Sequence, residues 1–320
     1  MTQLTRRETL TAALGLAGAA VLGGSPSCAE PLERPSGKAG MKIGCGTVVF
    51  RQRPLSEALQ RIRRAGYEYV ETQATGPWCP HVDPWKDDPQ GFRRRVDQLG
   101  FKGVTGLWSA HGAIVAEDKS VEGITQSIRW AKQAGIPVVH AGDGRKPDAM
   151  SEADALALLR DRLAKILEVA EECQVCLAIE PHGTFSMTAD GLLKIMGLSD
   201  SKWLGINYDT ANVHTATYPA AAPGAIPWKL FGRRQDEATT LAAVADRVRH
   251  VHAKDLAGAK CVALGEGTVN VAGCIRVLKR HGYAGVLSLE TEGDLDAEPA
   301  QRLIELSRAY LKGALGVLNQ

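Results

Sequence analysis

The sequence lacks a charge excess of either sign. Its 320 residues include 38 Lys and Arg against 36 Asp and Glu, which gives a formal net charge of +2. Acids and bases are interspersed, without a basic run of the kind that binds nucleic acid and without an acidic tail. We therefore expect no nucleic-acid partner, and the charge distribution alone indicates no other class of partner.

Cysteine is also scarce, with seven residues in a chain too long to depend on a disulfide framework. Cys173 and Cys176 have the spacing of a redox or zinc motif, but no second pair accompanies them. They lie where a predicted helix ends and a predicted strand begins. We interpret both as buried structural thiols.

The N-terminal apolar run, Thr11 to Gly24, is shorter than the roughly 20 residues that span a bilayer. It follows Arg6-Arg7 and precedes small residues up to Ala29, the order of a secretory signal. The paired arginines resemble a twin-arginine signal, which a dedicated translocase reads to export folded proteins. We expect a signal over 1–29, a linker over 30–40, and a periplasmic mature protein without a stable membrane anchor.

Short apolar and β-branched runs alternate with longer amphipathic stretches from Met41 onward. The runs predict eight strands: Met41–Val48, Tyr69–Ala74, Gly103–His111, Pro137–Gly142, Cys176–His182, Leu204–Asn212, His250–Asp255 and Gly285–Thr291. The stretches predict eight helices: Pro54–Ala65, Pro89–Leu99, Val121–Ala134, Ala153–Cys173, Ala189–Met196, Glu237–Arg247, Val271–His281 and Ala297–Leu311. Several helices end at a glycine before the next strand, as at Gly66 and Gly282, which is the usual left-handed cap.

Eight strands, each followed by a helix, predict an α/β fold, a single (β/α)8 TIM barrel over 41–320. The alternative is an open, doubly wound sheet with a nucleotide site. Gly44-Cys45-Gly46 has no third glycine opening a helix, so a dinucleotide site is not expected. The stretch from Thr215 to Asp236 is rich in Pro, Ala and Gly and is expected to form a lid or a flexible insertion.

The residues that carry chemistry gather at the predicted C-terminal ends of the last four strands, where such barrels place their active sites. Glu180, Asp209 and Glu290 each follow an apolar run, and His252 lies near the end of the seventh strand. One such acid alone could simply cap the next helix. Three carboxylates that converge on one mouth repel each other unless a cation neutralises them, so the set predicts a divalent metal site.

These motifs resemble those of the sugar phosphate isomerase/epimerase superfamily of xylose isomerase-like barrels. The resemblance covers the chain after the signal and is strongest at Ile179-Glu180, Asp209–Asn212, His250–Asp255, Leu264–Gly267 and Gly282–Glu290. It implies that Glu180, Asp209, His252 and Glu290 bind one divalent ion, manganese, magnesium, cobalt or zinc. It also implies that Glu180 and Glu290 act as an acid/base pair on a sugar, and that the chain could form a homo-oligomer.

Two departures narrow what the resemblance implies. Endonuclease IV, a member of the superfamily, has a histidine where this chain has Asn212. It also has an Asp-x-His pair after the seventh strand, which the segment Leu256–Ala263 lacks, so a phosphodiesterase acting on DNA is not expected. Epimerases often have a histidine at the Asn212 position too, where it contacts substrate. The resemblance therefore leaves the exact reaction open.

Other side chains at the mouth are expected to meet the substrate. His111 and His182 lie at the rim of the third and fifth strands and could bind sugar hydroxyls. Lys254 could stabilise a developing negative charge or simply lie in solvent. Trp108 could stack on a sugar ring or pack in the core. Asn212 is assigned to the substrate by the resemblance alone.

Three further polar residues lie near these ends. Glu71 ends the second strand and is expected to support the metal ligands from behind. His250 lies two residues before His252, hence one layer deeper, where a hydrogen-bonded supporting role is expected. His140 ends the fourth strand, and the Gly142–Gly144 segment beyond it is interpreted as a turn.

The expected chemistry is a metal-assisted proton transfer next to a carbonyl, with Glu180 and Glu290 on opposite sides of the ion. Return of the proton to the opposite face would be epimerisation, and transfer to the neighbouring carbon would be isomerisation. Expulsion of a β-hydroxyl or a glycosidic oxygen would make the protein a dehydratase or lyase. A non-catalytic sugar-binding barrel is the alternative of another class. The sequence indicates no phosphate-binding loop and no second metal site for a hydride shift.

Overall fold

The computed structural model describes residues 40–216, 231–293 and 295–316. The predicted signal, the linker up to residue 39 and most of the predicted insertion after the sixth strand lie outside these described residues. Within the described part of the chain, no helix has both the length and the apolar character needed to cross a membrane.

Eight parallel strands close into a barrel in the order β1-β10-β7-β6-β5-β4-β3-β2. They are β1 (Lys42–Gly46), β2 (Tyr69–Gln73), β3 (Gly103–Ala113), β4 (Val138–Gly144), β5 (Cys176–Gly183), β6 (Leu204–Asp209), β7 (Val248–Ala253) and β10 (Val286–Leu289). Each strand begins within two residues of its predicted start. The predicted (β/α)8 barrel is therefore confirmed.

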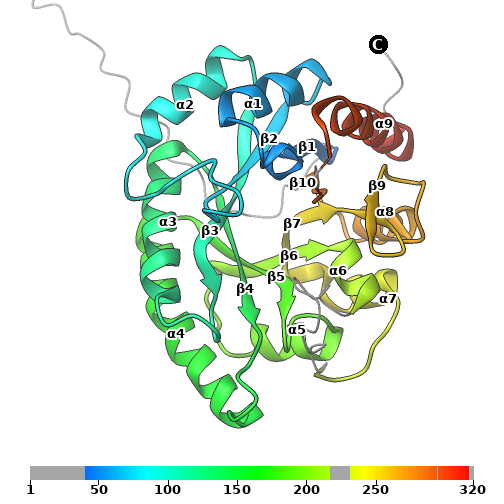
Figure 1. Cartoon of the computed structure of the whole chain (residues 1–320). Coiled ribbons are helices and arrows are strands. Elements are labelled where there is room, and N and C mark those ends of the chain that lie inside the picture. Colours follow the sequence, from blue (N-terminus) through cyan, green and yellow to red (C-terminus); the bar gives the residue numbers. More distant parts are fainter. Residues whose placement is uncertain (1–39, 217–230, 294, 317–320) are drawn as a thin grey trace, which may run out of the picture. The chain divides into compact units, whose positions relative to one another are not determined.

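Helices follow the strands and lie around the outside of the barrel (Figure 1). They are α1 (Leu55–Arg64), α2 (Pro89–Gln98), α3 (Ser120–Ala134), α4 (Glu152–Cys173), α5 (Ala189–Met196), α6 (Thr210–Thr215), α7 (Glu237–Val244), α8 (Val271–Arg280) and α9 (Ala297–Leu315). Short 3-10 turns follow β1 (η1, Thr47–Phe50) and α7 (η2, Ala245–Arg247). Side-chain caps fix several helix starts, as where Ser151 accepts from the Asp154 amide.

Two differences from the predicted elements affect the site. The sixth strand ends at Asp209 rather than Asn212, because the Asp209 carboxylate accepts the Ala211 and Asn212 amides and starts α6. After β7, the chain forms an unpredicted antiparallel hairpin of β8 (Asp255–Ala257) and β9 (Lys260–Val262). Both differences lie at the C-terminal end of the barrel, where the polar residues gather.

The apolar core fills the space between the strands and the surrounding helices. Tyr67 and Tyr208 are among its largest fully buried side chains. Cys173 and Cys176 are buried and unpaired, as predicted. The inside of the barrel differs from this core, because carboxylates, imidazoles and amides replace apolar side chains there.

Candidate metal centre

Four predicted ligands come together inside the C-terminal end of the barrel. They are Glu180 in β5, Asp209 at the end of β6, His252 in β7 and Glu290 directly after β10, and we call them the mouth cluster. One ligand atom from each lies within 4.8 Å of all the others, and all four side chains are buried. The structure therefore brings together the four residues that the sequence assigned to the metal.

His252 is oriented for this role by a carboxylate behind it. Its Nδ1 faces the cluster, 3.0 Å from Glu180 Oε2 and 3.3 Å from Glu290 Oε2. Its Nε2 lies 2.8 Å from Glu71 Oε1 on the other side of the ring. A carboxylate that accepts the second ring N–H fixes both the tautomer and the orientation of a metal-binding histidine. Glu71 therefore lies behind His252, as predicted for a residue that supports the metal ligands.

Asp209 uses its two oxygens for different purposes. Oδ1 accepts from the Ala211 amide at 2.8 Å and the Asn212 amide at 2.7 Å, which caps α6. Oδ2 faces the cluster, 3.9 Å from His252 Nδ1 and 3.0 Å from Lys254 Nζ. The capping role and the ligand role, which the sequence presented as alternatives, are therefore compatible in one side chain.

Amide side chains hold the two glutamates in place. Asn207 Nδ2 donates to Glu180 Oε2 at 2.7 Å, and Asn212 Nδ2 lies 3.3 Å from Glu180 Oε1. Gln73 Nε2 lies 3.3 Å from Glu290 Oε1. Asn212, predicted to face the substrate, thus contacts a metal ligand. Neither Asn207 nor Gln73 was singled out in the sequence, because a lone amide inside a strand carries no distinguishing pattern.

Lys254 lies inside the site rather than in solvent. Its Nζ is 3.0 Å from Asp209 Oδ2 and 2.6 Å from Glu290 Oε2, and it also reaches Glu292 at 3.2 Å. The side chain is only 3% exposed, so the expectation that it could be solvated is wrong. The ammonium neutralises part of the charge of the carboxylates, and a further cation would neutralise more of it.

The donor set fits a divalent ion. Three carboxylates and one imidazole suit manganese, magnesium, cobalt or zinc. Asp209 Oδ2 and Glu290 Oε2 are buried and lie 3.0 Å and 2.6 Å from Lys254 Nζ. Both also face His252 Nδ1, so a metal bound beside that nitrogen would share the two oxygens with the Lys254 ammonium.

The surroundings push the two glutamates to opposite protonation states. Burial raises the pKa of Glu180 to about 8, although the charge of His252 opposes the rise. Burial acts in the same direction on Glu290, but His252 and Lys254 outweigh it and hold the pKa of Glu290 well below its usual range. Without a metal at neutral pH, Glu180 is therefore mainly protonated and Glu290 ionised, which is the division expected of an acid and a base.

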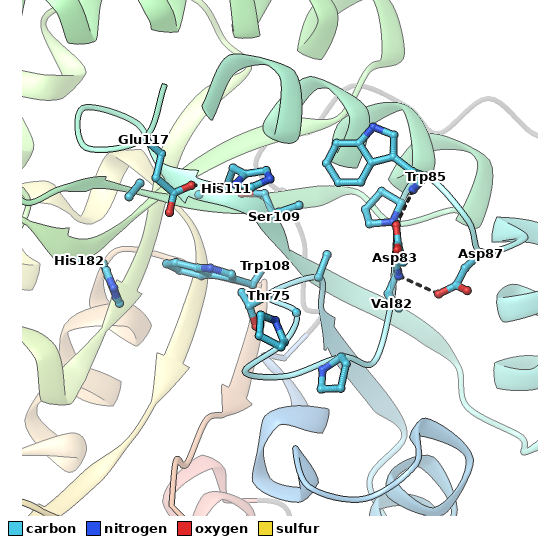
Figure 2. A pocket seen from close by; sticks show the side chains of 18 residues that line it. Thr75, Val82, Asp83, Trp85, Asp87, Trp108, Ser109, His111, Glu117 and His182 are labelled. Atoms are coloured by element: carbon cyan, nitrogen blue, oxygen red, sulfur yellow. Dashed lines mark hydrogen bonds and ion pairs between the residues drawn. The ribbon is translucent and has the colours of Figure 1, made fainter. Parts of the chain in front are cut away.

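Two adjoining cavities lead outward from the cluster, and the inner of the two is lined by cluster residues. The inner one, about 290 Å³, is bounded by Glu180, Glu290, Trp108 and His182, together with other side chains. The outer one, about 690 Å³, shares Trp108 and His182 with it (Figure 2). Their rings lie 5.3 Å apart in a tilted arrangement. Trp108 and His182, which were both predicted to face the substrate, therefore line the approach to Glu180 and Glu290.

His111 lies farther out. It lines the outer cavity with Trp85 and Glu117, and it is absent from the lining of the inner one (Figure 2). Its Nδ1 is 3.3 Å from Glu117 Oε2, and the backbone has φ 51°. The positive φ turns the chain near the rim, so His111 could meet only the outer part of a substrate.

A second group of polar residues lies beneath the mouth cluster. It consists of Glu71 in β2, His140 in β4 and His250 in β7, and we call it the deep cluster. His250 Nδ1 lies 2.9 Å from Asn207 Oδ1, which confirms its predicted hydrogen-bonded position one layer down. His140 differs from the prediction, because β4 continues to Gly144 and the ring points into the barrel beside His250.

The charges of the two clusters meet at Glu71. Burial raises its pKa, but His252 and His250 outweigh that effect and bring the pKa to about 2. Burial lowers the pKa of His140 to about 4 and that of His250 well below its ordinary value. At neutral pH the two deep imidazoles are therefore neutral, while Glu71 is ionised.

Comparison with known proteins identifies relatives across the barrel. Residues 59–313 match the family described as xylose isomerase-like TIM barrel. An uncharacterized protein of Methanocaldococcus jannaschii is 28% identical over 279 residues, covering 83% of this chain and 88% of that protein. L-ribulose-5-phosphate 3-epimerase UlaE of Escherichia coli is 24% identical over 270 residues, covering 81% and 89%. The crystal structure of a D-tagatose 3-epimerase-like protein superposes with a TM-score of 0.68 at 22% identity, covering 87% and 98%.

Proposed function

This chain belongs to the xylose isomerase-like TIM barrel family, and we propose that it is a divalent-metal-dependent epimerase or isomerase of a keto sugar. One observation carries the proposal: Glu180 and Glu290 line the same cavity and belong to a buried four-residue ligand set. The relative named as a sugar 3-epimerase supports the same reaction class.

Glu180, Asp209, His252 and Glu290 would hold the ion. When bound, it would polarise a carbonyl and a neighbouring hydroxyl and so acidify the intervening C–H. Glu290, kept ionised by Lys254 at 2.6 Å, removes that proton through a carboxylate oxygen. Glu180, on the other side of the ion, would return a proton to the opposite face, which inverts the carbon. Lys254 keeps its charge close to Glu290 and Asp209 throughout.

The cavities favour a neutral sugar over a sugar phosphate. Among the described residues, neither the inner nor the outer cavity is lined by an arginine or lysine. A third cavity of about 470 Å³, which shares Trp78 and Glu292 with the inner one, is lined by Arg51 and Lys254. Lys254 is already paired there with three carboxylates. A phosphate group usually requires such cations or a nest of backbone amides. We therefore propose a free ketose, a cyclitol or an oxidised glycoside as substrate, although the E. coli relative is named for a 5-phosphate.

The test is solvent exchange. The purified protein, loaded with Mn²⁺, is incubated in D₂O with ketopentoses and ketohexoses, each with and without a terminal phosphate, and the products are followed by NMR. Deuterium at the carbon next to the carbonyl, together with the epimer, would support the proposal. Exchange followed by loss of a β-substituent would instead indicate the dehydratase or lyase alternative. Binding without exchange for any of the compounds would indicate the sugar-binding alternative.

Export is a separate proposal. We propose that the paired arginines Arg6 and Arg7 direct the folded protein to the periplasm through the twin-arginine translocase. The matched variant replaces both with lysine and leaves the charge unchanged. Accumulation of the unprocessed chain in the cytoplasm of this variant would support the route, whereas unchanged periplasmic recovery would contradict it.

A further inference from the structure

We propose that the deep cluster, Glu71, His140 and His250, is a second metal site inside the barrel, suited to Zn²⁺. It is separate from the mouth cluster and does not depend on the proposed reaction. One ligand atom from each of the three residues, together with one from His252, falls within 4.8 Å of the others, and all four side chains are buried.

The strand register places this cluster below the mouth. His250 pairs with Asn207, whereas His252 pairs with Asp209, two residues farther along each strand. His140 pairs with Ala178, whereas Gly142 pairs with the ligand Glu180. Inward-facing residues alternate along a strand, so a step of two residues is one layer of the barrel interior. His140 and His250 therefore lie one layer closer to the N-terminal end than their counterparts at the mouth.

The imidazole of His140 is the least satisfied polar group of the deep cluster. Its exposed fraction is 0%, and neither Nδ1 nor Nε2 has a hydrogen-bond partner among the described residues. A buried imidazole normally pairs at least one nitrogen, so such a ring needs an explanation. The lack of a side chain at Gly106 makes room for the ring, since a Cβ on Gly106 would lie 2.1 Å from His140 Nε2.

The partners of His250 point its other nitrogen toward Glu71. Asn207 donates its amide N–H to Glu180, so its Oδ1 faces His250 Nδ1 at 2.9 Å and can only accept. The proton of the neutral ring is thereby assigned to Nδ1, and Nε2 carries the lone pair. Thr105 Oγ1 lies 3.4 Å from this Nε2 and 3.3 Å from the Val70 carbonyl oxygen, so its hydroxyl can donate to either.

Glu71 supplies the carboxylate. Its Oε2 is buried without a hydrogen-bond partner and lies 3.6 Å from His250 Nε2. Its Oε1 lies 3.7 Å from His140 Nε2 and accepts from His252. Tetrahedral zinc with Zn–N distances near 2.0–2.1 Å holds its ligand atoms roughly 3.3 Å apart. Two imidazoles and a carboxylate at these separations need only small side-chain movements to close on the ion.

The chemistry of the ligands separates the two sites. The mouth cluster has three carboxylates and one imidazole, which suits ions that prefer oxygen. The deep cluster has two imidazoles for one carboxylate, which favours Zn²⁺ over Mg²⁺. A trapped water that hydrogen-bonds to His140 is the competing explanation, because buried polar cavities often hold one.

The experiment uses the full mature protein, stripped with a chelator, reloaded with Zn²⁺ and dialysed. Zinc per chain is then measured for the unmutated protein and for three variants. His140→Asn removes a deep ligand, and Asp209→Asn removes a mouth ligand while keeping the oxygen that caps α6. Ser288→Ala is the matched control, because it removes another buried, unpartnered polar atom of the barrel that belongs to neither cluster. Crystals of the unmutated protein at the zinc edge locate the ions independently of any variant.

Two zinc ions per chain are expected in the unmutated protein and in Ser288→Ala, and one in each ligand variant. The anomalous map is expected to show a peak between Glu71 and His140. One ion per chain at the mouth, with a zinc content unaffected by His140→Asn, would overturn the proposal and favour trapped water. Because Asp209→Asn reports on the mouth alone, failure of the deep site would be distinguishable from failure of the proposed function.

Discussion

The mouth cluster and the deep cluster are neighbours joined by the contact of His252 with Glu71, yet their surroundings differ. Glu180 and Glu290 border a cavity that leads outward past Trp108 and His182. Neither the inner nor the outer cavity is lined by His140 or His250, and both residues are buried. The mouth is thus built to exchange ligands with solvent, whereas the deep cluster is closed.

The two clusters also differ in how charge is balanced. At the mouth, three carboxylates lie close to one ammonium and one imidazole. Below it, one carboxylate faces two imidazoles that burial keeps neutral. One layer of the barrel interior can therefore hold polar residues beside an open cavity, while the next layer holds buried ones.

Removing the base at the mouth has the largest expected effect. Glu290→Gln keeps the size of the side chain but cannot take a proton, so turnover should fall by roughly 10²–10⁴-fold. Deuterium exchange into the substrate measures this loss, and thermal unfolding checks that the fold persists. Glu292→Gln is the matched control, since that carboxylate also contacts Lys254 but lies outside the ligand set. Full activity of Glu290→Gln would remove Glu290 from the chemistry.

His140 should contribute to the acid sensitivity of the metal-free protein, measured as a difference from a variant without this imidazole. Burial lowers the pKa of His140 from 6.5 to about 4, so the unfolded chain binds a proton at a higher pH than the folded chain does. Its contribution to the free energy of unfolding is therefore complete above pH 6.5 and lost as the pH falls toward 4. The loss amounts to about 3 kcal/mol at 1.36 kcal/mol per pKa unit.

Urea unfolding at several pH values between 7 and 4 measures this effect in chelator-treated protein. The unmutated protein and Ser288→Ala should both lose this stability, and His140→Asn should lose correspondingly less. Parallel pH profiles for all three proteins would show that His140 does not couple folding to protonation.

Glu71, which contacts His252 from the deep cluster, should affect the metal affinity of the mouth cluster. Glu71→Gln replaces the charged acceptor of His252 Nε2 with a neutral one, so the Mn²⁺ affinity of the mouth cluster should fall by about 10–100-fold. Calorimetric titration with Mn²⁺ gives the dissociation constant directly. An unchanged constant would mean that His252 keeps its orientation without the Glu71 charge.

The smallest effect is expected at the cavity wall. Trp108→Leu should raise KM by roughly fivefold, equivalent to about 1 kcal/mol of aromatic contact, and leave kcat within about a factor of two. Trp85→Leu is the control, because Trp85 lines the outer cavity but not the inner one. A lower kcat with unchanged KM for Trp108→Leu would place the indole in the chemical step instead.

The residues of the mouth cluster could be predicted from the sequence better than those of the deep cluster. Glu180, Asp209 and Glu290 stand out because each ends an apolar run, and the end of a strand in a parallel barrel is also a position in space. The eight strands themselves are visible for the same reason, since alternating strand and helix patterns leave few other arrangements. The fold and the metal ligands could therefore be predicted from local patterns.

The remaining site residues depend on register and on side-chain partners. His140 lies in a strand whose seven residues are all buried, so no alternation marks which of them face inward. Asn207 and Gln73 gain their roles only from contacts with Glu180 and Glu290 across the barrel. Lys254 has the same sequence pattern whether it lies in solvent or between carboxylates. These residues could not be assigned without coordinates.

The most direct test of the metal centre compares Mn²⁺ content in the unmutated protein and in Asp209→Asn after identical loading and dialysis. The substituted asparagine can still cap α6, so the fold should persist while one ligand charge is lost. We predict that the variant holds one ion per chain fewer than the unmutated protein and shows no deuterium exchange. Equal metal content in the two proteins, with Asp209→Asn fully active, would contradict a metal centre at the mouth of this barrel.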